Sequence, residues 1–253
     1  MKKTIYIFTL KCFTHLFSLF ILQSVNSQTN LPNLIKQIIP GSSGMYPSVI
    51  QFNSAQGPAF INGQVVMVNE KGNLESIGNL KLVNSGKDQI EQWHYRYQQI
   101  YKGIPVENAI MAVYIKNGKI DRENGNFIKD FPARLSVNNI INKDDALKYA
   151  LSVILAQKYA WQDESREQRI KNIKKDPTAT NYPKAELVWY NGDREKLDTT
   201  LQLAYRLEVF AISPMSHNII YIDAQNGKLL GKKSLINEKA KKINKITLNM
   251  TIK

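Results

Sequence analysis

The chain has 253 residues, 34 lysines and arginines against 21 aspartates and glutamates, and a formal net charge of +13. Its one cysteine, Cys12, lies in an apolar N-terminal run, so the sequence beyond that run excludes disulfides and thiolate zinc sites. We therefore expect stability to come from a packed core of apolar side chains, which make up 43% of the residues.

The N-terminal segment 1–27 reads as a secretory signal peptide. Lysines follow the first methionine, a mostly apolar stretch runs from Ile5 to Leu22, and small residues precede a cut after Ser27, which is the order typical of such leaders. The alternative is a membrane anchor, but Lys11 and His15 leave the run short of the ~20 apolar residues that a span needs. We expect a secreted or periplasmic protein with no stable membrane anchor after cleavage.

The N-terminal segment 28–58 contains one candidate helix, Leu31–Ile39. It ends at Pro40-Gly41 and a loop rich in serine and glycine, residues that interrupt regular structure. We expect a flexible lead-in here and no part of the core.

Residues 59–132 read as a meander of antiparallel strands. Strand-like sequence covers Gln64–Val68, Gln92–Tyr101 and Ala109–Lys116. The dipeptide Asn117-Gly118 follows directly, and it favours a tight hairpin because both central residues must reach positive φ.

Residues 133–235 begin with a predicted helix. Asn142 is a plausible N-cap, and Asp144 and Asp145 lie in the first turn, where the helix dipole favours acids. The apolar positions that follow have helical spacing: Ala146, Leu147, Ala150, Leu151, Ile154 and Leu155. The polar stretch Trp161–Pro183 reads as a continuation of this helix followed by a loop.

Two strands complete this part. Apolar and polar residues alternate over Leu201–Val209, as in a half-buried strand. Asn218–Ala224 is a second strand, which the turn Gln225–Lys228 leads back into Leu229-Leu230. The fold class is therefore α+β, an antiparallel sheet meander lobe followed by a lobe with a helix on an antiparallel sheet, with Pro132 as the boundary.

The basic tail 236–253 is rich in lysine. Such a segment can contact nucleic acid or an anionic surface. A solvated charge run is the simpler interpretation, and export argues against nucleic acid as a partner.

Catalytic templates do not fit the sequence. A zincin motif needs two histidines one helical turn apart, whereas His94 and His217 are far apart in the chain. Gly41-Ser42-Ser43-Gly44 has the wrong spacing for a serine nucleophile elbow, and no carboxylate pair or phosphate-binding loop stands out. We expect no catalytic residue, no metal site, no cofactor and no enzyme activity.

The segment His94–Val106 resembles the fungalysin/thermolysin propeptide (FTP) domain. It matches the pattern His-x-Arg-Tyr-x-Gln-x-Tyr-x-Gly-Ile-Pro-Val. The family usually has glycine-rich sequence after the valine, and Glu107-Asn108-Ala109 stands there instead.

The stretch Val137–Leu230 resembles the PepSY domain, a cystatin-like fold that follows in the same propeptides. A Lys-Asp-Asp-Ala-Leu helix start and the ending Tyr-x-Asp-Ala-x-x-Gly-x-x-Leu carry this likeness. Together the two resemblances mark a set of family-motif residues with a structural or partner-binding role: His94, Arg96, Tyr97, Gln99, Tyr101, Gly103, Ile104, Pro105, Val106, Tyr221, Asp223, Ala224 and Gly227. Sheet packing accounts for Tyr95, Tyr97 and Tyr101 better than partner contact does.

The resemblance implies a propeptide that inhibits a thermolysin-type zinc metallopeptidase, assists its folding, or does both. Only a lysine-rich segment follows Leu230, too short for a catalytic domain, so we expect action on a separate peptidase. Two alternatives stay open: a truncated remnant of a peptidase precursor, and a PepSY-type envelope protein that binds another partner.

Overall fold

A computed structural model describes residues 34–53, 56–61, 63–69, 73–192 and 200–236. The predicted signal peptide, Cys12 and nearly all of the basic tail lie outside the described residues. The strands of the first half are β1 (Ile35–Ile39), β2 (Val49–Phe52), β3 (Val65–Val68), β4 (Leu74–Ile77), β5 (Leu80–Lys87), β6 (Trp93–Tyr101), β7 (Ile104–Lys116) and β8 (Lys119–Gly125). The second half contains α2 (Lys143–Ile154), β9 (Lys158–Tyr159), the 3-10 turn η1 (Ala160–Gln162), α3 (Glu164–Lys174), β10 (Glu186–Tyr190), β11 (Gln202–Ser213), β12 (Ser216–Asp223) and β13 (Leu229–Ser234).

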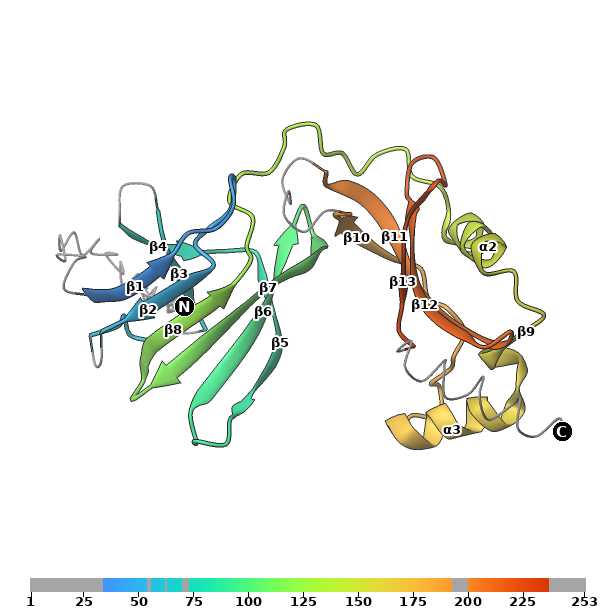
Figure 1. Cartoon of the computed structure of the whole chain (residues 1–253), viewed down its shortest axis with the longest axis horizontal. Coiled ribbons are helices and arrows are strands. Elements are labelled where there is room, and N and C mark those ends of the chain that lie inside the picture. Colours follow the sequence, from blue (N-terminus) through green and yellow to red (C-terminus); the bar gives the residue numbers. More distant parts are fainter. Residues whose placement is uncertain (1–33, 54–55, 62, 70–72, 193–199, 237–253) are drawn as a thin grey trace, which may run out of the picture. The chain divides into compact units, whose positions relative to one another are not determined.

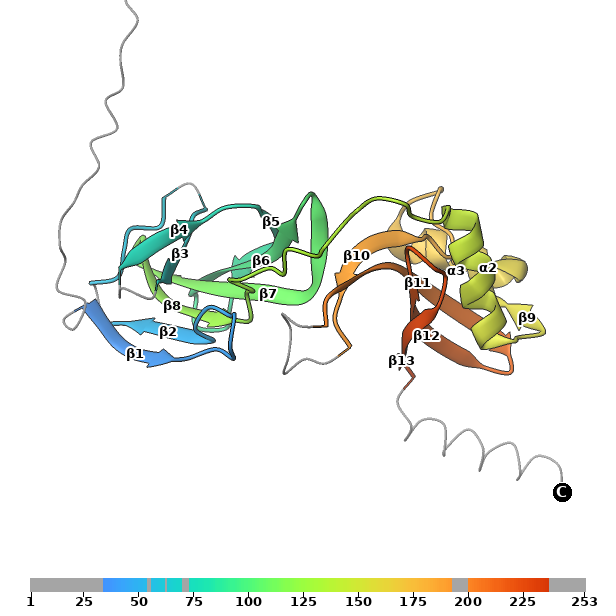
Figure 2. The ribbon, with the colours of Figure 1, turned by 90° about the horizontal axis from the view of Figure 1, so that it is seen from above.

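The fold is α+β, with a large mixed sheet and two α-helices among the described residues (Figure 1). The strands follow the order β1-β2-β8-β7-β10-β11-β12-β13, with β6 paired to β7 and β5 paired to β6. All of these pairs are antiparallel except β7 with β10, which is parallel and meets at Val106 and Trp189. Strands β3 and β4 form a separate two-stranded sheet that lies against β8 (Figure 2), where the Val66 amide donates to Glu123.

Several local predictions are confirmed. Asn117 and Gly118 both take positive φ, 52° and 74°, in a hairpin that pairs Lys116 with Lys119. The α2 N-cap is Asn142, whose side-chain oxygen accepts the Asp145 amide at 2.8 Å. No described helix is both long and apolar enough to cross a membrane.

The predicted helix over Leu31–Ile39 is wrong. Residues 35–39 form β1, which pairs antiparallel with β2, and the β2 residues Ile50 and Phe52 are fully buried. This segment belongs to the sheet and is no flexible lead-in. A short apolar run has no decisive period of its own, so pairing with β2 determines its conformation.

The predicted continuation of the first helix through Trp161 is also wrong. Leu155 ends α2 in a left-handed conformation (φ 50°), and a new helix, α3, begins after the N-cap Asp163. The sequence analysis also missed β10, whose five residues follow a long polar stretch. The parallel contact between β7 and β10 corrects the expectation that every strand pair is antiparallel.

The Asn142 cap provides a first test. Asn142→Ala removes the acceptor for the Asp145 amide and should lower the free energy of unfolding by ~1 kcal/mol, as measured for other N-caps. Chemical denaturation followed by circular dichroism measures this change. Asn84→Ala, at an exposed position of β5, is the control and should change the stability by less than ~0.5 kcal/mol.

Candidate functional site

The inward side chains of the family motif are part of the core. Tyr97 and Gln99 alternate along β6 and are 5% and 4% exposed. The Gln99 side chain donates to the Ile128 carbonyl at 2.7 Å and accepts the Ile128 amide at 2.9 Å. These two hydrogen bonds satisfy both the amide and the carbonyl of the buried Ile128, and they hold β6 against the segment after β8. Gln99 therefore has a structural role.

The motif's turn leads into the contact between the two halves. Gly103 takes φ 76° between β6 and β7, a conformation that glycine adopts without steric cost. The following Ile104 and Pro105 are partly buried, and Val106 is fully buried beside Trp189.

Tyr101 connects the motif to β10. Its ring stacks on Phe131 with centroids 3.9 Å apart, and its carbonyl accepts the Trp189 indole N–H at 2.9 Å. Trp189 is 1% exposed, so this hydrogen bond is shielded from water.

Asn108 forms a bend in β7 directly after the motif. Its φ is 63°, in the left-handed region that asparagine tolerates better than most residues. Gln98 supports this bend by donating to the carbonyls of Val106 and Ala109 at 2.6 and 2.9 Å. The conformation of Asn108 and the Gln98 hydrogen bonds therefore accommodate this bend.

Glu107 joins the bend to the C-terminal motif. The Tyr221 hydroxyl donates to its carboxylate at 2.6 Å, and Arg206 approaches the same oxygen at 3.9 Å. Burial, helped by the hydrogen bond and charge of Glu107, raises the pKa of Tyr221 well above its usual value. Tyr190 stacks on Tyr221 at 3.9 Å.

The rest of the C-terminal motif shapes one hairpin. Asp223 accepts the amides of Gln225 and Asn226, and Gly227 takes φ 74°. A Cβ at Gly227 would lie 2.5 Å from the Tyr149 ring, so α2 packs directly on this turn. The Ala224 amide donates to the Leu203 carbonyl, and the Ala224 carbonyl accepts the Ile141 amide. All four motif residues, Tyr221 included, thus have structural contacts.

His94 and Arg96 are different, because they alternate with the buried residues and point to the opposite face of the sheet. Arg96 is exposed and His94 is partly buried. Neither contributes to the buried core.

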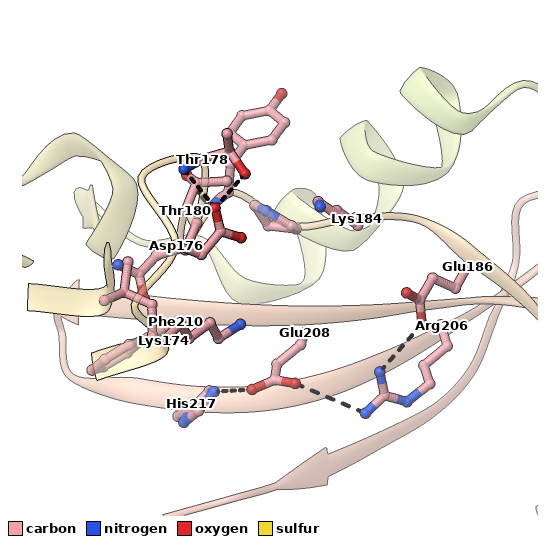
Figure 3. Close-up of a pocket in the computed structure, with 15 residues that line it drawn as sticks. Lys174, Asp176, Thr178, Thr180, Lys184, Glu186, Arg206, Glu208, Phe210 and His217 are labelled. Carbon is pink, nitrogen blue, oxygen red and sulfur yellow. Dashed lines mark hydrogen bonds and ion pairs between the residues drawn. The ribbon is translucent and has the colours of Figure 1, made fainter. Parts of the chain in front are cut away.

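A separate groove of about 570 Å³ lies between α3, the loop before β10 and the strands β11 and β12 (Figure 3). Charged side chains follow one another across its floor: Glu186 and Arg206 approach at 4.0 Å, Arg206 and Glu208 at 3.9 Å, and Glu208 and His217 at 2.8 Å. Phe210 stacks on His217 with centroids 4.9 Å apart. Sequence reasoning did not find this groove, because its walls come from segments distant in the chain.

The groove's loop is held by carboxylates. Glu167 accepts hydrogen bonds from the Thr180 hydroxyl and from the Asn181 backbone and side chain; partial burial opposes ionisation, but these bonds together lower its pKa. Hydrogen bonds from Thr178 lower the pKa of Asp176. These carboxylates fix the loop. Within the described ranges, no group of three histidine, cysteine, aspartate or glutamate side chains is arranged to hold a metal.

Comparison with known proteins gives a consistent result. The family model for the Fungalysin/Thermolysin Propeptide Motif matches residues 78–127, the stretch that contains β5 to β8. Thermostable neutral protease NprT of Geobacillus stearothermophilus is 24% identical over 76% of this chain and 35% of its own length. Thermolysin of Alicyclobacillus acidocaldarius subsp. acidocaldarius is 26% identical over 78% of this chain and 36% of its own length.

The chain spans about a third of the length of these curated relatives. Among solved structures, the Bacillus megaterium YpeB C-terminal domain matches with a TM-score of 0.35 and 11% identity, over 79% of this chain and 89% of that one. A match with so low a TM-score is no evidence for the fold of this chain.

Proposed function

We propose that the chain is a non-catalytic, propeptide-like protein that binds a thermolysin-type zinc metallopeptidase and inhibits it, assists its folding, or does both. The observation that carries this proposal is the match of the propeptide family to residues 78–127. The relatives that share most of this chain are themselves named as proteases, and the matched share is about a third of their length. A propeptide works by surface complementarity and needs no reacting group of its own.

The proposal includes the organisation expected from the sequence. Residues 59–132 form the FTP-like unit, residues 133–235 the PepSY-like unit, and the mature protein begins near Gln28 outside the cytoplasm. The junction of Val106, Glu107, Trp189 and Tyr221 supports joint action of the two units, because it links their motifs by direct contacts.

Inhibition is the direct test. The purified mature chain, added up to ~10 μM, should slow a thermolysin-type peptidase encoded by the same genome and raise the refolding yield of that peptidase after denaturation; specific interfaces of standard size saturate well below this concentration. Activity on a peptide substrate and recovered activity after refolding are the two readouts. No effect on either would favour the remnant or the envelope-binding alternative.

The absence of catalysis is tested separately. The chain alone, with zinc and calcium, should hydrolyse neither casein nor short peptides, because a catalytic zinc requires three protein ligands around an open position. Proteolysis that persists through purification and disappears with a chelator would contradict this expectation.

A further inference from the structure

One face of strands β6, β7 and β8 carries cationic and aromatic side chains in register. Directly paired residues of antiparallel strands share a face; His94 pairs with Tyr114, and Tyr114 pairs with Arg122. The Arg122 guanidinium lies 4.3 Å from the centre of the Tyr114 ring, and the His94 and Tyr114 ring centres are 6.3 Å apart. These contacts place the three side chains in one row.

A second row runs parallel to the first. Arg96 pairs with Asn84 on one side and with Ala112 on the other. Two residues further along β6, Gln98 pairs with Lys81 and so brings this lysine to the same face. We call His94, Arg96, Tyr114, Arg122 and Lys81 the basic face.

The basic face has no internal neutralisation. Among the described residues, neither Arg96 nor Arg122 forms an ion pair with a carboxylate. The carboxylate nearest in sequence to Arg122 on one side is Asp121, which lies at the β8 bulge and contacts Gln92 at 3.5 Å. On the other side, Glu123 points into the core, where it is 1% exposed.

None of the five side chains of the basic face belongs to the buried core. The opposite face of the same strands is the core: Met111, Val113 and Ile120 are at most 1% exposed there, and β3 covers Glu123. Arginine and tyrosine are, with tryptophan, the residues enriched in the energetic centres of protein interfaces. A guanidinium over an aromatic ring is also held in place before a partner arrives.

We propose that the basic face docks a carboxylate-rich surface of the peptidase partner, with Arg96 and Arg122 as its central contacts. This inference rests on the proposed function and adds to it the surface and the charge of the partner. Charge complementarity determines the choice: the paired rows contain cations and no carboxylate, so an acidic protein surface fits and a second copy of this basic face does not.

The experiment compares charge variants of the full mature chain in the peptidase inhibition assay. Arg96→Glu combined with Arg122→Glu should weaken inhibition at least ~10-fold, because it places like charges at the contact. Arg96→Gln combined with Arg122→Gln keeps the aliphatic stems and should give a smaller loss. For the wild type, inhibition should weaken as NaCl rises from ~50 to ~500 mM. The variant with glutamate at positions 96 and 122 should lose this salt dependence.

The matched control is Lys232→Glu combined with Lys233→Glu, which makes the same change in net charge at exposed positions of β13. It should inhibit like the wild type, and circular dichroism should show that all variants are folded. Equal inhibition by the wild type and by both double variants of Arg96 and Arg122 would contradict docking through the basic face. It would leave the proposed function intact. No inhibition and no gain in refolding yield with the wild type, or binding only to phosphatidylserine vesicles, would overturn both.

Discussion

Replacing Glu123 with glutamine is expected to stabilise the protein at pH 8 and to remove the pH dependence of stability that this carboxyl causes above pH 4.5. Glu123 is 1% exposed on β8. One carboxyl oxygen accepts the Val66 amide at 3.2 Å, and the other has no hydrogen-bond partner among the described residues. Burial raises the pKa of this carboxyl to about 8, although the Val66 hydrogen bond partly opposes the shift.

The direction of the pH effect follows from proton linkage. Between pH 4.5 and about 8 the unfolded chain has lost this proton and the folded protein keeps it, so the free energy of unfolding falls as the pH rises through that window. The difference between the folded and unfolded pKa values of Glu123 corresponds to a change of at most ~5 kcal/mol in the free energy of unfolding. The folded protein is therefore most stable, with respect to this group, below pH 4.5.

Urea denaturation at a series of pH values between ~4 and ~9 measures this effect. Glu123→Gln should give a flatter profile and its largest gain at the alkaline end. Asp121→Asn, two positions away and only partly buried, is the control and should leave the slope of the wild-type profile unchanged. A wild-type profile that is flat or rises over this window would contradict the assignment.

Local chemistry explains which parts of the fold were predictable. The Asn117-Gly118 hairpin and the Asn142 cap depend on residues a few positions apart, and both were correctly predicted. Strands β1 and β10 depend on distant partners. Strand β10 pairs with β11 on one side and with Val106 of β7 on the other. No periodic pattern within its five residues predicts this pairing.

The candidate site shows the same division. The sequence analysis marked His94 to Val106 as one motif, yet alternation along β6 sends Tyr97 and Gln99 into the core and leaves Arg96 on the surface. Which face is buried depends on where β3 packs, through its contact with Glu123. The groove beside His217 could not be predicted for the same reason, because α3 and the loop after it meet strands β11 and β12 only in the fold.

Trp189→Ala is expected to lower the free energy of unfolding by ~3–5 kcal/mol, as large-to-small changes of a fully buried aromatic residue do. The side chain is 1% exposed, lies beside Val106 and donates to the Tyr101 carbonyl. Trp189→Phe keeps most of the volume and removes this hydrogen bond, so it should cost less, ~1–3 kcal/mol, mainly from the buried carbonyl left without its partner. Trp93→Ala, at a position 45% exposed on β6, is the control and should cost ~1 kcal/mol or less.

The same variant tests whether the two proposed units fold as one. Val106 and Trp189 belong to one core cluster that includes Met111 of the first half and Leu207 of the second. If this contact couples the halves, the wild type should unfold in a single transition by both near-ultraviolet and far-ultraviolet circular dichroism, and Trp189→Ala should separate it into two. Two transitions already present in the wild type would mean that the halves are stable independently, and the Trp189 substitution should then destabilise only the transition of the half that contains β10.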